Sequence, residues 1–149
     1  MTASELPPSI QDFNEITALI FGHLYTSFPI PTKLNPDELV SALGLQDRHA
    51  PMSSERPFDH LLSHTVQWLT NEDFIRSLHP IPLERVVLTA KGMAAMNVVP
   101  PTLSRPLGSE LADAAGQAST EGGKRKIAEL MGNFFGSLMG SFTKSISGS

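Results

Sequence analysis

The sequence predicts a mainly α-helical protein with one small β-hairpin and a C-terminal helical tail rich in glycine and alanine. Three segments repeat apolar residues at steps of three and four, the period of a helix with one buried face. Two short β-prone segments flank the proline-rich stretch 79–82. Of the 149 residues, 40% are hydrophobic and 17% are charged, which is enough apolar material for one core.

The first helix is expected over residues 9–28. Its apolar residues recur on one helical face, at Phe13, Ile16, Ile20, Leu24 and Phe28. Pro29 and Pro31 end the helix, because proline has no N–H to continue the hydrogen-bond ladder and disfavours helical geometry in the residue before it.

A second, short helix is expected to begin at Pro36. Asn35 supplies an N-cap oxygen, proline suits the first helical position, and Glu38 places a carboxylate in the first turn. Gly44 can adopt the left-handed conformation that closes a helix. A polar loop over residues 46–57 follows it.

A third helix is expected over residues 58–69, where apolar residues again follow the helical period. Beyond Asn71 the pattern changes to two β-prone segments, 74–78 and 85–88, which predict a hairpin with an irregular loop. Thr89 then caps a last short helix that ends near Asn97. Gly92 is a weak point of that helix, because glycine lowers helix stability.

The composition changes near residue 100, where prolines and then alanine, glycine and serine become frequent. We therefore expect a domain over residues 9–100, a linker over 101–123 that can hold a short helix, a helix over 124–144 and a disordered end over 145–149. The negative charge resides in the first part of the chain, since residues 1–103 hold eleven acidic and six basic side chains, a net charge of −5, whereas the remainder has a net charge of +1. This balance excludes a surface that attracts nucleic acid or anionic lipid everywhere.

The predicted order of elements is helix, short extended piece, helix, loop, helix, hairpin and helix. This order resembles the winged-helix domain, a helix-turn-helix with a hairpin wing, over about residues 9–100. The run 86–93, VVLTAKGM, is similar to the end of the wing in many bacterial winged-helix proteins. The resemblance implies a DNA-binding regulator whose third helix enters the major groove. The residues that would contact DNA are Gln67, Asn71, Arg76, Arg85 and Lys91.

The charges of the third helix favour a protein partner over DNA. Phosphate binding needs Lys and Arg, yet neither occurs between Arg56 and Arg76. Asp59, Glu72 and Asp73 lie in the same stretch. We therefore expect a protein-interaction module and keep the DNA-binding regulator as the alternative.

The sequence offers no motif for catalysis or for a cofactor. The absence of cysteine excludes disulfides, thiol catalysis and thiolate metal sites. His60 and His64 stand four apart, the spacing of a shared metal, but the Glu of the zincin motif is missing and a solvated polar face is the simpler interpretation. No nucleophile elbow or complete phosphate-binding loop occurs. We expect no enzyme, cofactor, metal site or small-molecule substrate.

The tail carries the strongest functional signal. Small residues recur every fourth position at Ala128, Gly132, Gly136 and Gly140, a glycine-zipper pattern that lets two helices approach closely. A weaker echo of this spacing occurs at Gly108, Ala112 and Gly116. Apolar residues complete the expected partner-binding surface: Leu130, Met131, Phe134, Phe135, Leu138, Met139 and Phe142.

Several partners stay open for this helix. One is a second copy of the chain or another protein, which gives a homo-oligomer or a complex. Another is an anionic membrane surface, which Lys124, Arg125 and Lys126 would contact; the apolar run 127–142 contains Glu129 and is shorter than the roughly 20 residues that a span needs. The third is the chain's own domain. We expect a cytoplasmic protein without a secretory signal, with a membrane-peripheral protein as the alternative.

Overall fold

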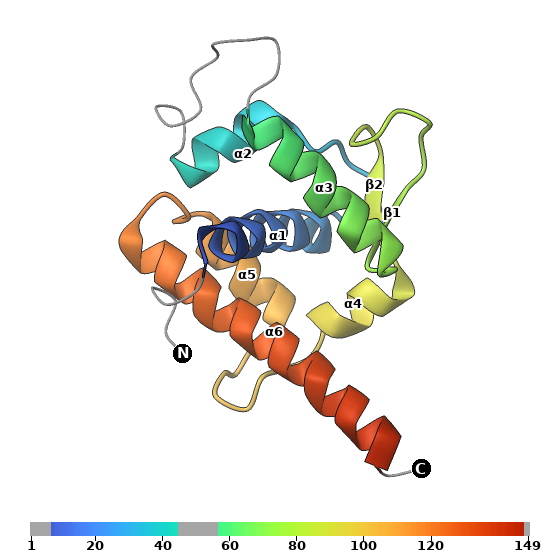
Figure 1. Cartoon of the computed structure of the whole chain (residues 1–149), viewed down its shortest axis with the longest axis vertical. Coiled ribbons are helices and arrows are strands. Elements are labelled where there is room, and N and C mark those ends of the chain that lie inside the picture. The colour runs from blue at the N-terminus through green and yellow to red at the C-terminus, as the bar shows by residue number, and fades with distance from the viewer. Residues whose placement is uncertain (1–6, 45–56, 148–149) are drawn as a thin grey trace.

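The computed structural model describes residues 7–44 and 57–147, and beyond residue 138 it describes the helix backbone alone. This part of the chain forms six helices and one two-stranded antiparallel sheet (Figure 1). The elements are α1 (Pro8–Ser27), α2 (Pro36–Leu43), α3 (Pro57–Asn71), β1 (Ile75–Ser77), β2 (Val86–Leu88), α4 (Ala90–Met96), α5 (Leu107–Ala115) and α6 (Glu121–Ser147). The predicted class, mainly α with a small hairpin, is confirmed.

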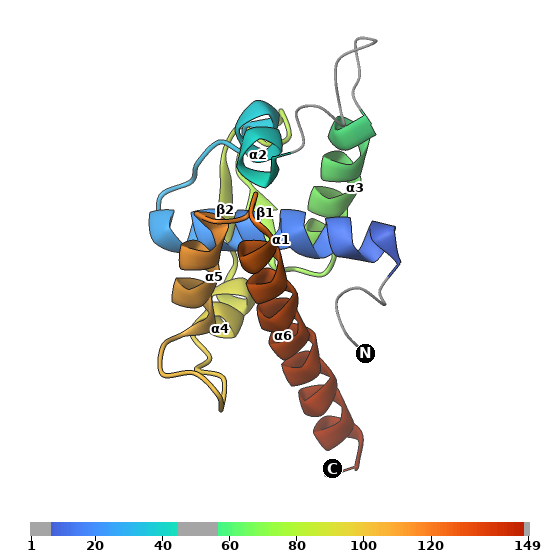
Figure 2. The same cartoon turned by 90° about the vertical axis from the view of Figure 1, so that its left-hand side faces the viewer.

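Helix α1 is the centre of the molecule. Figures 1 and 2 show α2 and α3 on one side of it and α4, α5 and α6 on the other. Ile16, Ile20, Phe21 and Leu24 of α1 are fully buried between these two layers. The helix ends at Ser27, one residue before the predicted end, and Pro29 follows.

The predicted helix caps are present. The Asn35 side chain accepts a hydrogen bond from the amide of Asp37 (2.9 Å), and Gly44 closes α2 with a φ of 71°. The Thr89 hydroxyl accepts one from the amide of Gly92 (3.0 Å) at the start of α4. Gly92 is needed there, because a Cβ atom at this position would collide with the carbonyl oxygen of Phe74. Gly92, which was predicted to weaken this helix, therefore allows a close contact between α4 and Phe74.

The predicted hairpin forms, with an extended segment along its outer edge. β1 and β2 are antiparallel, with Ile75 opposite Leu88 and Ser77 opposite Val86. Thr32, from the segment between α1 and α2, exchanges two backbone hydrogen bonds with Val86 (2.9 and 2.8 Å). The hairpin is thereby joined to the α1–α2 connection.

The core continues across the boundary that the composition suggests near residue 100. Helix α5 lies within the expected linker and packs along α1, where Leu107 and Leu111 are buried. Small residues allow this contact: a Cβ on Gly22 would lie 3.0 Å from the Cα of Ala112, and one on Gly108 would meet the ring of Tyr25. The short helix allowed for within residues 101–123 is therefore α5, and it packs as part of the core.

Helix α6 returns to the same core. Ile127, Leu130, Met131 and Phe134 are buried, and the ring of Phe134 makes T-shaped contacts with those of Phe21 and Phe74 (5.3 and 5.4 Å between centroids). The helix begins three residues before the expected 124 and continues through 147, so residues 145–147, expected as a disordered end, are helical. Its C-terminal part extends past the other helices (Figure 2).

Candidate functional site

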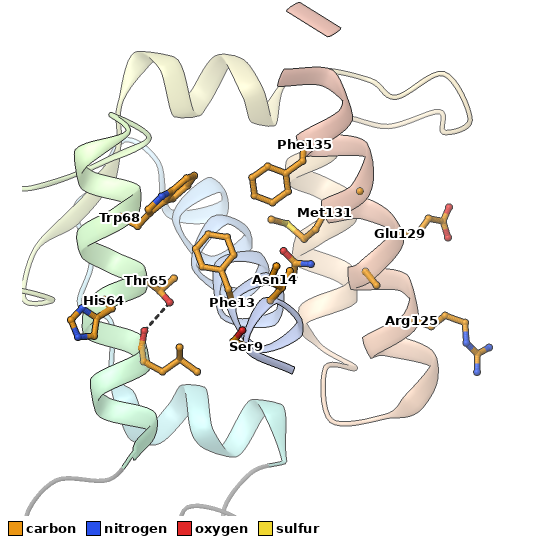
Figure 3. A pocket seen from close by; sticks show the side chains of 14 residues that line it. Ser9, Phe13, Asn14, His64, Thr65, Trp68, Arg125, Glu129, Met131 and Phe135 are labelled. Carbon is orange, nitrogen blue, oxygen red and sulfur yellow. Dashed lines mark hydrogen bonds between the residues drawn. The ribbon is translucent and has the colours of Figure 1, made fainter. Parts of the chain in front are cut away.

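An apolar groove of about 940 Å³ opens between α1, α3 and α6. The first two turns of α1 form its floor, the middle of α3 forms one wall, and residues 125–135 of α6 form the other. Figure 3 shows this arrangement, with Trp68 and Phe135 facing each other across the space and Phe13 between them. Its volume lies within the range of about 300 to 1,000 Å³ that is typical of ligand sites.

Aromatic rings line the interior of the groove. Phe13 meets Trp68 edge to face at 5.3 Å between ring centroids, and it lies 6.2 Å from Phe135. Trp68 is 40% exposed and Ile10 is 45% exposed, so large apolar surfaces of α3 and α1 face solvent at the groove. Such surfaces are stabilised when another apolar group covers them.

The floor of the groove holds a buried amide. Asn14 is only 7% exposed, and its Oδ1 atom has no hydrogen-bond partner. Thr65, which is also buried at the groove, is satisfied because its hydroxyl donates to the carbonyl oxygen of Leu61 (2.8 Å). Buried acceptors without a partner are uncommon and unfavourable. The Oδ1 atom of Asn14 is thus an unmet acceptor that is closed off from solvent behind the apolar lining.

Charged residues lie at the margin of the groove and not in its interior. Figure 3 shows Arg125 and Glu129 directed from α6 away from the space between the helices, and His64 directed from α3 to the opposite side. The interior is therefore formed by apolar and aromatic groups together with Asn14.

The small-residue face of α6, formed by Ala128, Gly132 and Gly136, lies on the side away from the core. Gly132 and Gly136 are exposed, and a Cβ atom added to either one would meet nothing within 4 Å. Ala128 and Gly132 also line the groove, so this face and the groove adjoin. Gly140, the next member of the predicted pattern, lies outside the residues whose side chains are described.

The structure corrects the assignment of the apolar tail residues. Leu130, Met131 and Phe134 were expected to bind a partner, but they are buried in the core because α6 packs against α1 and α5. Phe135 and Leu138 are half-buried at the edge of the core. The predictions for Met139 and Phe142 concern side chains outside the described set.

The two histidines of the weak metal hypothesis are both exposed on α3. Across residues 7–44 and 57–138, no group of three or more His, Cys, Asp or Glu side chains has an arrangement that could hold a metal ion. His64 contributes to the margin of the groove.

The candidate DNA contacts are distributed over α3, the hairpin and α4. Gln67 and Asn71 are exposed on α3, and Arg76 and Arg85 are exposed at the hairpin. Lys91 differs from them, because its Nζ donates to the carbonyl oxygen of Glu72 (2.9 Å) and lies 4.5 Å from the centre of the Phe74 ring. Lys91 therefore stabilises the contact between α4 and the start of the hairpin.

One residue of the basic cluster at the start of α6 forms contacts within the fold. Lys124 pairs with Glu15 of α1 (3.0 Å) and donates to the carbonyl oxygen of Leu43 at the end of α2 (3.1 Å). Arg125 is exposed and Lys126 is half-buried. Within the described ranges, no helix has the length and hydrophobicity that crossing a bilayer requires.

Sequence reasoning did not identify the groove. Its floor and walls come from three helices that are far apart in the chain, and no short motif contains them. The one local signal is Asn14, a polar residue within the apolar face of α1. Comparisons of the chain with protein-family models, with curated proteins and with solved structures find no match.

Proposed function

We propose that this chain is a non-catalytic protein-interaction module that associates with a second copy of itself through the small-residue face of α6. The observation that carries the proposal is the open space at Gly132 and Gly136. Glycine within a helix costs about 1 kcal/mol relative to alanine. No contact among the described residues requires glycine at either position.

A helix that packs on this face would explain both glycines. Small residues at four-residue spacing let two helix backbones approach closely, so that many weak contacts form along the seam. Phe135 and Leu138 at the edge of the core, together with the groove, supply apolar area beside the seam. A two-fold arrangement would use the same face on both copies and would close into a dimer.

The proposal is tested by measuring the mass in solution by light scattering. We expect the full chain to be dimeric or larger, and we expect the double variant Gly132→Leu with Gly136→Leu to be monomeric. Both leucines enter open space on a helix whose propensity they raise, so the variant should melt no earlier than the original chain when both are compared at a concentration where the original chain is monomeric.

The matched control is Gly122→Leu. Gly122 lies on the same helix and is also open to solvent, but it is outside the small-residue face. This variant should keep the original mass. A monomeric full chain, or a double variant that keeps its mass, would contradict the proposal.

One second candidate is a winged-helix regulator of transcription. It is favoured by the order α1, Thr32 bridge, α2, α3 and hairpin, which fits the predicted winged-helix order. Two observations argue against this candidate. Helix α3 contains no Lys or Arg, and the side chain of Lys91 already contacts Glu72 and Phe74. The candidate requires duplex DNA binding at low salt that weakens steeply as salt is added, and a mobility shift tests this.

Attachment to an anionic membrane surface has less support. Lys124, the first residue of the basic cluster, is held by Glu15 and Leu43. Co-sedimentation with anionic vesicles that is lost in Arg125→Ala with Lys126→Ala would support this attachment over self-association.

A further inference from the structure

We infer that the outer side of the small sheet binds a short acidic segment of a partner protein, one that carries an aliphatic side chain beside its carboxylates. The residues that carry the inference are Lys33, Arg76, Leu78 and Arg85, and together they are named the cationic face. The inference goes beyond self-association through α6 and does not depend on it.

The register of the hairpin places three of these residues on one side of the sheet. Arg76 lies opposite Val87. Two residues further along, the amide of Leu78 donates to the carbonyl oxygen of Arg85 (2.8 Å). Opposite residues, and every second residue of a strand, share one side of a sheet. These residues therefore lie on the side away from Ile75, which is buried in the core.

Lys33 joins this side from the extended segment that runs along β2. Thr32 exchanges two backbone hydrogen bonds with Val86, and its hydroxyl lies 3.2 Å from Nε2 of His23 in α1, so Thr32 belongs to the core side. Because side chains alternate along an extended segment, the next residue, Lys33, belongs to the outer side, beside Arg85.

The cationic face differs in charge from the rest of this part of the chain. Residues 1–103 are acidic overall, yet three of the four basic side chains that the structure describes there lie on this face, and the fourth is Lys91. Lys33 pairs with Glu84 (3.6 Å), whereas Arg76 and Arg85 are exposed and have no ion pair within the described ranges. Like charges on neighbouring strands repel, and a bound anion removes this cost.

An exposed aliphatic side chain favours a protein segment over a nucleic acid as the anion. Leu78 is 46% exposed and lies on the same face as Arg76 and Arg85. An aliphatic side chain of a peptide can cover it, which a phosphate backbone does not do. Glu72 and Asp73 are exposed just before β1 and would repel a long polyanion, whereas a short acidic segment need not reach them.

Short peptides with blocked ends test the inference on the full chain. The acidic peptide is Glu-Glu-Leu-Glu-Glu, its neutral counterpart is Gln-Gln-Leu-Gln-Gln, and Glu-Glu-Ser-Glu-Glu lacks the aliphatic side chain. NMR titration of the backbone amides measures each affinity and shows which residues respond. We expect the acidic peptide to shift the amides of β1 and β2 and to bind about tenfold more tightly than the neutral peptide. The serine peptide should bind about threefold more weakly than the acidic leucine peptide.

Matched variants locate the interaction. Arg76→Gln with Arg85→Gln removes two exposed charges and should weaken binding of the acidic peptide about tenfold without lowering the melting temperature. Leu78→Ser should remove the advantage of the leucine peptide over the serine peptide. The control, Arg125→Gln with Lys126→Gln, removes the same charge at the start of α6, across the molecule from the hairpin (Figure 1), and should keep the affinity.

Three results would overturn the inference. The first is equal affinity of the acidic and neutral peptides, or an unchanged affinity in the hairpin double variant. The second is the absence of amide shifts at about 1 mM acidic peptide. The third is a short DNA duplex that shifts the same amides and binds more tightly than the acidic peptide, because the cationic face is then a nucleic-acid interface and the protein partner is wrong.

Discussion

Two groups of small residues in this molecule have different surroundings. At the contact of α1 with α5, Gly22 faces Ala112 and Gly108 faces Tyr25, so these small residues allow two helices of the same chain to touch. On the outer face of α6, Gly132 and Gly136 face open space. Spacing alone predicts close helix packing in both places, but only the three-dimensional surroundings show which seam is already filled.

The comparison assigns different roles to the two places. The α1–α5 seam is filled by contacts within the fold, and the outer face of α6 is the surface that we propose binds a partner. Substitutions at the filled seam should lower the free energy of unfolding, and substitutions on the open face should change association without unfolding the chain. The variants below test this division.

The largest effect is expected for Leu111→Ala in α5. Leu111 is completely buried in the core that α1 and α5 share, so its truncation leaves a cavity and should lower the free energy of unfolding by about 2 to 5 kcal/mol. Urea denaturation monitored by circular dichroism measures this change. Leu78→Ala, at an exposed leucine of the hairpin loop, is the control and should change stability by less than about 0.5 kcal/mol. A small effect of Leu111→Ala would mean that α5 is a linker after all.

Alanine substitutions at two glycines of α6 should change the free energy of unfolding in opposite directions. Gly123→Ala should destabilise the chain by about 1 to 3 kcal/mol, because the new Cβ atom would collide with the carbonyl oxygen of Gln117. Gly132→Ala should stabilise the helix by about 1 kcal/mol, because its Cβ atom meets nothing. Melting at a concentration where the chain is monomeric separates these effects from association. If both variants change the melting temperature in the same direction, the distinction between close-packed and open glycines is wrong.

The ion pair that fixes the start of α6 should give a smaller effect. Lys124→Gln breaks the pair with Glu15, both of whose side chains are partly buried, and should cost about 1 kcal/mol of unfolding free energy. Lys126→Gln is the control from the same basic cluster, for which we expect no measurable change. The loss should shrink as salt is added, because salt screens the pair. Equal effects of the two variants would show that Lys124 has no special role in the fold.

Local features of the fold were predictable from the sequence. The caps at Asn35 and Thr89 and the left-handed Gly44 depend on neighbouring residues only, and all three are present. Helix α5 was not predictable as part of the core, since a segment rich in Ala, Gly and Ser has the composition of a linker. The structure shows that these small side chains are what allows α5 to approach α1 closely.

The site was less predictable than the fold. The four-residue spacing in α6 marked Gly132 and Gly136, which face open space, but the same hypothesis assigned Leu130 and Phe134, which are buried, to a partner. Helical periodicity could not decide which side of α6 faces the core, because the helix is apolar around most of its circumference. The groove forms only where α1, α3 and α6 pack together, so Asn14 and Trp68 line one space although they are far apart in the sequence.

The smallest effect is expected for Thr17→Val, which compares two buried polar atoms without partners. Thr17 is completely buried and its hydroxyl is unsatisfied, like the Oδ1 of Asn14, but Thr17 does not line the groove. A valine of the same shape removes the unmet group and should stabilise the chain by about 0.5 to 1 kcal/mol. Asn14→Leu should stabilise the chain for the same reason, since its unmet oxygen is equally closed off from solvent. Thermal melting measures both changes. A lower melting temperature in both variants would mean that these two polar atoms are not unsatisfied in the folded chain.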